Sequence, residues 1–416
     1  MNIKTTIISI SLGLSLNIAN AQSVKKQNTS TLKTNKTFAA NGKWRGVFQI
    51  KPGVDVPFNF EINNDKIFFI NAEERFDGGK VYQTGDSVKV KLDQFDNELA
   101  LQLKGDSLTG TLRKQDYSGK PITLTAKRGE NFRFKTSGEK ATENYSGTYE
   151  VTFKNPTGTD EKSVGVFKQT GNKLTGTFLR VTGDSRYLEG VVEGNNFYLS
   201  SFIGSTPAYY KGSFSKNGEI TGESVNSRGS IVFAGIQNQN AELPDAFKLT
   251  YLKEGYKTLD FSFPDVNGKR ISLSDEKFKG KPVILTITGT WCPNCVDEAS
   301  FIAPWYKENK KRGVEVIAIH YERQLDSAYV KKALTAFRQK FDIKYDQVVA
   351  GKPDKQLVAE SLPALNNFLS FPTTIFINKK GEVAKIHTGY SGPATGKFYT
   401  AFVEEFNKEV DRLLNE

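Results

Sequence analysis

The chain contains only two cysteines, and they lie three positions apart in the segment Trp291-Cys292-Pro293-Asn294-Cys295. Two thiols at this spacing can form a disulfide across the first turn of a helix. There, free backbone N–H groups and the positive end of the helix dipole stabilise the thiolate of the first cysteine. The spacing therefore predicts a dithiol redox centre.

A close cysteine pair has two other possible uses, as an inert buried pair or as half of a zinc site. Zinc requires two further ligands. The chain has 2 histidines, His320 and His387, and they lack the short paired spacing of zinc motifs. Each is more typical of a packing or surface histidine than of a ligand. We expect no metal and favour redox chemistry over both alternatives.

The first residues have the pattern of a secretory signal, with Lys4 before an apolar stretch and Ala19-Asn20-Ala21 as a cleavage site. Residues 1–21 are therefore predicted to be a signal peptide. No later segment comes near the roughly 18 consecutive apolar residues that a membrane helix needs. We expect a mature chain without a transmembrane segment, located in the periplasm or another extracytoplasmic space. In an exported chain with a single close cysteine pair, we expect that disulfides do not stabilise the fold.

The formal net charge of +11 raises the possibility of nucleic-acid binding, but predicted export argues against it. Residues 22–40 carry four lysines and no acidic residue among Ser, Thr and Asn, which predicts a flexible basic leader. A length of 416 residues exceeds what one hydrophobic core usually holds, so we expect several domains.

Short runs of alternating apolar and polar residues fill the chain from about residue 42 to residue 235. They are separated by turn segments such as Thr170-Gly171-Asn172 and Gly194-Asn195. This regular spacing predicts antiparallel hairpins. We therefore predict two sequential all-β units, residues 41–137 and 143–240, each a barrel or a sandwich.

The pattern changes after the polar run Gln237-Asn238-Gln239-Asn240, which predicts a linker. Apolar runs at 283–287 and 314–319 suit a buried sheet, and a closing hairpin is expected at 374–377 and 383–386. We expect the helices at 296–311, 327–341 and 397–414. Alternating strands and helices predict an α/β domain.

Residues 256–416 resemble the thioredoxin superfamily, and within it the TlpA/ResA-type extracytoplasmic thiol-disulfide oxidoreductases. Residues 261–269 resemble the lead-in hairpin of that family, and Gly280-Lys281-Pro282-Val283 precedes the strand that leads to the cysteines. Phe371-Pro372-Thr373-Thr374 resembles its cis-proline turn. The resemblance implies a thioredoxin-like domain and activity on protein disulfides. The β region resembles no family that we can name.

The resemblance also implies roles for individual residues. Cys292, at the helix start and the more exposed thiol, is expected to be the nucleophile, and Cys295 is expected to resolve the mixed disulfide. Trp291 either shapes the docking surface beside the thiols or is a plain core aromatic. A cis Pro372 would let the backbone of Phe371 add β-type hydrogen bonds to an extended substrate.

Glu298 is the third candidate catalytic residue. In ResA-like proteins a glutamate at this spacing lies close to the thiols and tunes them, whereas typical thioredoxins carry an acidic residue at the position of Thr286. Without the resemblance, Glu298 could equally be a solvated helix charge. Ser300 stands where the family has a helix-kinking proline, and Pro304 follows one turn later.

The sequence favours an exported reductase of protein disulfides. Strong oxidants of this fold often carry a histidine between the cysteines, and Pro293 and Asn294 supply no charge. No flavin or nicotinamide motif is visible, so we expect no cofactor and predict a membrane protein as electron donor. A disulfide oxidase or isomerase is the less favoured direction. A peroxidase is disfavoured because Gly289 stands where peroxiredoxins have threonine.

An alternative function from another class is binding of a partner or ligand by the β region, with the thioredoxin-like domain in an auxiliary role. The β units contain neither cysteine nor histidine. We therefore expect the chemical step to belong wholly to the C-terminal domain, with the β units recruiting substrate.

Overall fold

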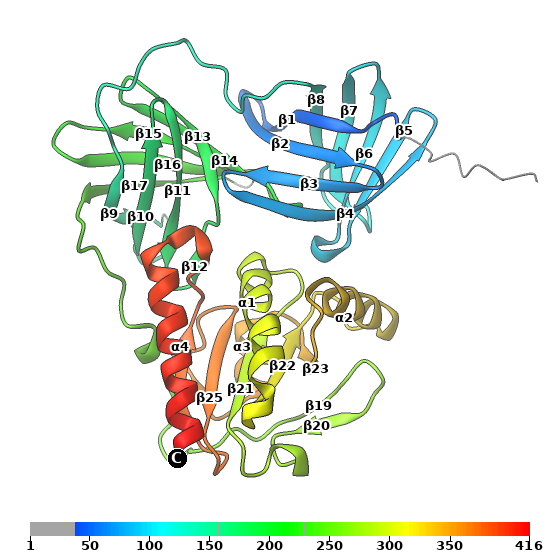
Figure 1. Ribbon diagram of the computed structural model, residues 1–416, viewed down its shortest axis with the longest axis vertical. Helices are drawn as coiled ribbons and strands as arrows, with labels where there is room; N and C mark the ends of the chain where they lie inside the picture. Colours follow the sequence, from blue (N-terminus) through cyan, green and yellow to red (C-terminus); the bar gives the residue numbers. More distant parts are fainter. Residues whose placement is uncertain (1–37, 156–157, 228) are drawn as a thin grey trace, which may run out of the picture. The chain divides into compact units, whose positions relative to one another are not determined.

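Two all-β units precede an α/β domain in the computed structural model, which describes residues 38–155, 158–227 and 229–416 (Figure 1). The predicted signal peptide and residues 22–37 of the predicted leader lie outside the described residues. Phe38–Glu416 form one compact unit. Among the described residues, no helix is both long and apolar enough to cross a membrane.

The first β unit is a closed antiparallel barrel of eight strands, which β1 and β8 close by pairing with each other. Side chains along β1 alternate between buried and more exposed, because one face of the strand lines the barrel interior. The elements are β1 (Gly42–Lys51), β2 (Val54–Asn63), β3 (Lys66–Asn71), β4 (Glu74–Thr84), β5 (Ser87–Leu92), the 3-10 helix η1 (Asp93–Phe95), β6 (Asn97–Lys104), β7 (Ser107–Lys114) and β8 (Ile122–Arg128).

The second β unit is a nine-stranded antiparallel sheet that also closes, because β10 pairs with both β9 and β11. Both predicted all-β units are therefore closed sheets. The strands are β9 (Gly147–Phe153), β10 (Glu161–Thr170), β11 (Lys173–Arg180), β12 (Gly183–Asp184), β13 (Leu188–Glu193), β14 (Asn196–Ser201), β15 (Ala208–Phe214), β16 (Glu219–Asn226) and β17 (Gly229–Gln237).

One side chain from the second barrel is buried in the core of the first. Phe202, which follows β14, is 1% exposed and belongs to the same apolar cluster as the barrel residues Phe48 and Phe58. Its ring makes edge-to-face contacts with Phe48, Phe58 and Phe69 at centroid distances of 4.7, 5.2 and 4.8 Å. The Phe202 backbone N–H also donates to Asn71 Oδ1 at 3.2 Å. The two barrels therefore share part of one hydrophobic core.

The C-terminal domain has the thioredoxin-like arrangement of a central sheet with helices. The sheet order is β23-β22-β21-β25-β26, in which β21, β22 and β23 are parallel and β25 and β26 are antiparallel to their neighbours. Its elements are β21 (Val283–Thr288), α1 (Pro293–Asn309), β22 (Glu315–Tyr321), α2 (Ser327–Phe341), β23 (Asp346–Gly351), α3 (Lys355–Ser361), β25 (Thr373–Ile377), β26 (Val383–Thr388) and α4 (Lys397–Asn415).

Shorter elements lead into and connect this sheet. The expected lead-in hairpin is present as β19 (Ser262–Pro264) paired with β20 (Arg270–Ser272). The others are η2 (Ala246–Lys248), β18 (Tyr251–Leu252), η3 (Glu276–Phe278), η4 (Lys310–Arg312), β24 (Leu365–Asn366) and η5 (Pro393–Thr395).

Most predicted elements of this domain are confirmed, with small shifts. Helix α2 has the predicted bounds, whereas α1 begins at Pro293, three residues before the expected start. The closing hairpin β25–β26 is present. Strand β23 and helix α3 were not predicted, because each is too short to show a clear periodicity.

Replacing Phe202 with alanine is expected to lower the free energy of unfolding by about 3–5 kcal/mol, because it removes a large buried ring and leaves a cavity. Urea denaturation of the full chain measures this change. The matched control is Phe132→Ala, since Phe132 is 40% exposed. We expect a loss of about 1 kcal/mol or less for this control. Equal losses in the two variants would contradict the shared core.

Candidate redox site

The two cysteines lie at the first turn of α1, just after the buried strand β21. Cys292 is the N-cap residue and Pro293 occupies the first helical position, where its missing N–H costs nothing. The Cys295 backbone N–H donates to Cys292 Sγ at 3.3 Å. The sulfur of the first cysteine therefore accepts one of the otherwise unpaired N–H groups at the helix start, an interaction that favours its thiolate.

Both cysteines are free thiols, and both are buried. Cys292 is 5% exposed and Cys295 0%, so the expected order of exposure holds although neither thiol lies open on the surface. Burial raises the pKa of Cys295 well above its ordinary value, and the neighbouring Cys292 raises it further. The second thiol therefore stays protonated near neutral pH.

The candidate substrate-binding residues surround the first thiol. The Phe371–Pro372 peptide bond is cis, as expected, and Cys292 Sγ donates to the Phe371 carbonyl at 3.5 Å. The rings of Trp291 and Phe371 are 5.6 Å apart and edge to face. Trp291 Nε1 also donates to the Tyr321 carbonyl at 2.8 Å, which fixes the indole beside the thiol.

Glu298 is buried rather than solvated, with an exposure of 2%. Burial raises the pKa of its carboxyl to about 8, although a hydrogen bond from Thr374 Oγ1 at 2.5 Å opposes the rise. Its charge contributes to the raised pKa of Cys295, so the two groups lie within electrostatic range. Pro304 lies inside α1. Thr286, where typical thioredoxins have an acid, is buried on β21.

A second buried acid near the cysteines was not predicted. Glu322, directly after β22, is fully buried and accepts hydrogen bonds from Thr290 N at 2.9 Å and Thr290 Oγ1 at 2.7 Å. These bonds hold the loop that carries Trp291 and Cys292. The one feature of the sequence that could have indicated this buried acid is its position as a charged residue directly after an apolar strand run.

The two histidines are buried away from solvent. His320 Nδ1 lies 3.3 Å from Glu322 Oε1, and the ring packs edge to face on Phe337. His387 Nδ1 is 3.1 Å from the Gly389 carbonyl, and burial lowers the pKa of this imidazole to about 4. Of the two expected uses, packing or surface, the burial of both rings fits packing.

Comparison with known proteins covers the C-terminal part of the chain. The Redoxin family model matches residues 253–401. The thiol-disulfide oxidoreductase ResA of Bacillus subtilis is 35% identical over 139 residues, which are 33% of this chain and 69% of that protein. The chain belongs to the ResA-type thiol-disulfide oxidoreductases.

Other relatives match the same region. ResA of Geobacillus kaustophilus is 32% identical over 140 residues, covering 34% of this chain and 72% of the relative. A crystal structure described as a putative thiol:disulfide interchange protein DsbE from Chlorobium tepidum is 21% identical. It covers 38% of this chain and 99% of the other, with a TM-score of 0.29.

The second barrel, which lies before this region, contacts the ResA-type redox helix directly. Arg186 Nη1 lies 2.5 Å from Asp297 Oδ2 and donates to the Pro293 carbonyl at 3.0 Å. Asp184 N donates to Asn294 Oδ1 at 3.4 Å. Both residues between the cysteines are therefore bonded to the second barrel. The sequence did not predict these contacts, and the expectation that the chemical step belongs wholly to the C-terminal domain stays a prediction.

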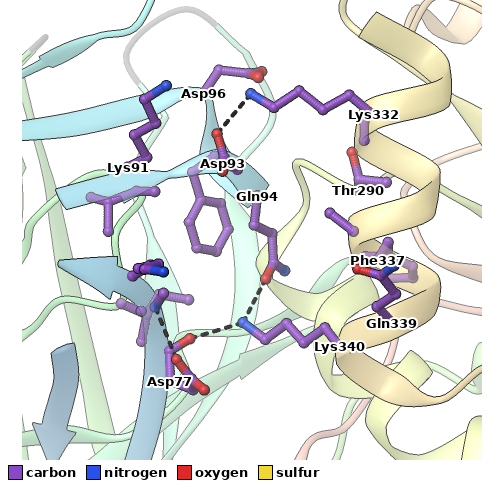
Figure 2. Close-up of a pocket in the computed structure, with 18 of the residues that line it drawn as sticks. Asp77, Lys91, Asp93, Gln94, Asp96, Thr290, Lys332, Phe337, Gln339 and Lys340 are labelled. Atoms are coloured by element: carbon purple, nitrogen blue, oxygen red, sulfur yellow. Dashed lines mark hydrogen bonds and ion pairs between the residues drawn. The ribbon is translucent and has the colours of Figure 1, made fainter. Parts of the chain in front are cut away.

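The first barrel faces helix α2 across a cavity of about 470 Å³ (Figure 2). Lys332 Nζ on α2 donates to Asp93 Oδ1 at 2.8 Å, and Lys340 Nζ donates to Gln94 Oε1 at 2.8 Å. The cavity wall also includes Thr290, two residues before Cys292. These polar pairs lie beside an apolar cluster that contains buried residues of both this barrel and the redox domain, such as Phe95 and Phe337.

The raised pKa of Glu298 predicts that the free energy of unfolding depends on pH. The folded state holds this carboxyl neutral up to about pH 8, against an ordinary pKa of 4.5, so the unfolded chain loses this proton first. The contribution of Glu298 to stability is therefore present at low pH and lost as the pH rises through about 8.

In the reduced protein, Glu298→Gln should flatten the pH dependence of the free energy of unfolding. Between about pH 5 and pH 8, the change in this free energy should differ from that of the parent by on the order of a few kcal/mol. Urea denaturation at several pH values measures it. The exposed Glu308 lies on the same helix, so Glu308→Gln is the matched control and should keep the parent's pH profile. An unchanged profile for Glu298→Gln would show that this carboxyl is ordinarily ionised.

Proposed function

We propose that this protein reduces protein disulfides by dithiol exchange through Cys292 and Cys295. The observation that carries the proposal is the hydrogen bond from Cys295 N to Cys292 Sγ at the N-terminus of α1. It places the first sulfur where the helix favours a thiolate, with a protonated thiol one turn behind it.

In the proposed reaction, the Cys292 thiolate attacks one sulfur of a partner disulfide. A Cys292–partner bond forms as the partner's S–S bond breaks, and the second partner sulfur leaves as a thiolate that takes a proton from solvent. Cys295 then attacks Cys292 and releases the partner as a dithiol. The partner gains two electrons, and the Cys292–Cys295 disulfide is left.

Glu298 is proposed to assist the second step. Cys295 must lose its proton before it attacks, and its raised pKa makes this loss unfavourable in the buried site. A neighbouring carboxyl with a pKa of about 8 can exchange a proton near neutral pH. The deprotonated carboxyl is therefore the proposed acceptor of the Cys295 proton.

The surfaces around Cys292 support an extended protein substrate. Phe371 precedes the cis proline, and its carbonyl already accepts from the Cys292 thiol. We propose that a substrate strand binds to the backbone at Phe371 and Pro372 and contacts the half-buried Trp291 ring beside it. Oxidised enzyme would be returned to the dithiol by a membrane electron-donor protein.

The direction of electron flow is proposed from the charges around the thiols. Pro293 and Asn294 carry no charge, and the Cys295 thiolate is strongly disfavoured by burial. A dithiol without strong thiolate stabilisation gives up its electrons more readily than one whose thiolate is stabilised. We also propose an extracytoplasmic location for this activity, which the predicted signal at residues 1–21 supports.

Cys292→Ser should abolish reduction of insulin disulfides by the full chain, and Cys295→Ser should accumulate mixed disulfides on Cys292 because no resolving thiol remains. Non-reducing electrophoresis and mass spectrometry of trapped adducts measure the two outcomes. Ser300→Ala, an exposed change on the same helix, is the control and should keep parental activity. Adducts on Cys295 in the Cys292→Ser variant would reverse the assignment, and retained activity would contradict the proposed reaction.

A further inference from the structure

The turn at residues 183–186 of the second barrel lies against the dipeptide between the two cysteines. Gly183 approaches Asn294 so closely that a Cβ atom on this glycine would lie 2.1 Å from Asn294 Nδ2. Asp184 and Arg186 bond to Asn294 and to the Pro293 carbonyl, as described above. A side chain at position 183 would displace the Asn294 amide, and the φ of +135° at this position also favours glycine.

Arg186 joins three parts of the molecule at this turn. Its guanidinium pairs with Glu74 of the first barrel and with Asp297 of α1. The side chains of Arg186, Glu74 and Asp297 are 8%, 10% and 13% exposed. The backbone of Arg186 has a φ of 56°, a left-handed conformation that costs free energy for a residue with a side chain. Asp184 Oδ1 accepts from Arg186 N at 2.6 Å and holds this conformation.

The loop after β26 is held by the same turn. Asp184 Oδ2 accepts from Gly392 N at 2.6 Å, and a Cβ atom on Gly389 would lie 2.4 Å from the Val181 carbonyl. The second barrel therefore contacts the redox domain at both the inter-cysteine residues and a neighbouring loop.

We propose that Arg186 is a positioning residue of the redox site, which fixes the first turn of α1 and balances the negative charge of Asp297 beside the thiols. This inference rests on the proposed dithiol chemistry of Cys292 and Cys295. It also assigns to the second barrel a part in the reaction, in place of the expected role in recruitment alone.

The charges explain why a cation is needed here. Burial raises the pKa of Asp297 to about 7, and the charge of Arg186 opposes this rise. Burial alone would lower the pKa of Arg186, but Asp297 and Glu74 together raise it, so the guanidinium stays charged. Without Arg186, the charge that opposes the effect of burial on Asp297 would be gone, so the pKa of this carboxyl would rise further. The helix start would lose a nearby positive charge that favours a thiolate, and the first turn would lose its bond to the barrel.

The titratable groups that interact around Arg186 lie on β4, β12, α1, α2 and α4 and in the loops after β12 and β26. They are Glu74, Asp184, Tyr187, Asp297, Glu298, Lys340, Tyr390 and Tyr399. Lys340 is the one cation in this set, and burial lowers its pKa to about 8. The carboxyl groups in this set therefore outnumber the cations even with Arg186 present.

The test compares Arg186→Met with Arg133→Met in the full chain. Arg133 is an equally buried arginine that lies 3.6 Å from Glu189 and donates to the Ser200 carbonyl at 3.2 Å, both in the second barrel. Both variants are expected to lose stability, because each removes a buried guanidinium that pairs with a carboxylate. Two redox readouts separate them: the pH midpoint of Cys292 alkylation and the equilibrium of the cysteine pair with glutathione.

Only Arg186→Met should raise the alkylation midpoint, by about 1 pH unit. Only this variant should shift the glutathione equilibrium toward the disulfide, by about tenfold or ~30 mV. A midpoint and equilibrium equal to those of Arg133→Met would overturn the inference. Neither readout depends on the direction of electron flow, so a failure of this inference is distinguishable from a failure of the reductase proposal.

Arg186→Lys serves if Arg186→Met does not fold. Lysine keeps the charge but lacks the planar fork whose two nitrogens reach Asp297 and Glu74 together. We expect shifts in the same direction and of smaller size. An Arg186→Lys variant identical to the parent in both readouts would also overturn the positioning role.

Discussion

The hydrogen bond from Cys295 N to Cys292 Sγ combines a structural requirement with a chemical one. A helix leaves its first N–H groups without partners inside the helix, and the buried start of α1 offers little water to satisfy them. The sulfur of Cys292 fills this place as the N-cap. The same N–H favours negative charge on the sulfur that is proposed to attack. The sulfur atom that caps α1 is therefore the same atom that is proposed to act as the nucleophile.

The titratable groups around this turn differ in their charge near neutral pH. Glu298 and Cys295 lie on the buried side of α1, where low polarity keeps both protonated near neutral pH. Asp297, the residue before Glu298, faces Arg186 of the second barrel. The start of α1 thus has a neutral, proton-exchanging side and a charged side that is bonded to the barrel. Its N-terminal end presents Cys292 to the cis-proline loop.

The sequence predicts much of the redox domain, because its signals are local. Helix α2 combines an apolar stripe with the capping side chain of Asp326, which accepts from Tyr329 N, and its bounds are the expected ones. The cysteine spacing and Phe371-Pro372 likewise lie within short segments. Helix α3, with 7 residues, is too short for a comparable pattern.

What the sequence does not reveal depends on contacts between distant segments. Arg186 is 107 positions before its carbonyl partner Pro293, and nothing around it in the sequence distinguishes it from a surface arginine. The burial of Glu298 depends on Thr374, which is 76 positions away on β25. Residues in the barrels can therefore be part of the redox surroundings without belonging to any recognisable motif.

The reduction potential of the Cys292–Cys295 pair in the full-length protein tests the central claim most directly. Equilibration with glutathione buffers, followed by mass spectrometry of alkylated cysteines, gives this value. A dithiol that donates electrons to protein disulfides should have a potential below about −220 mV. A value near about −120 mV, the range of strong oxidants, would contradict the account and assign the protein to disulfide formation instead.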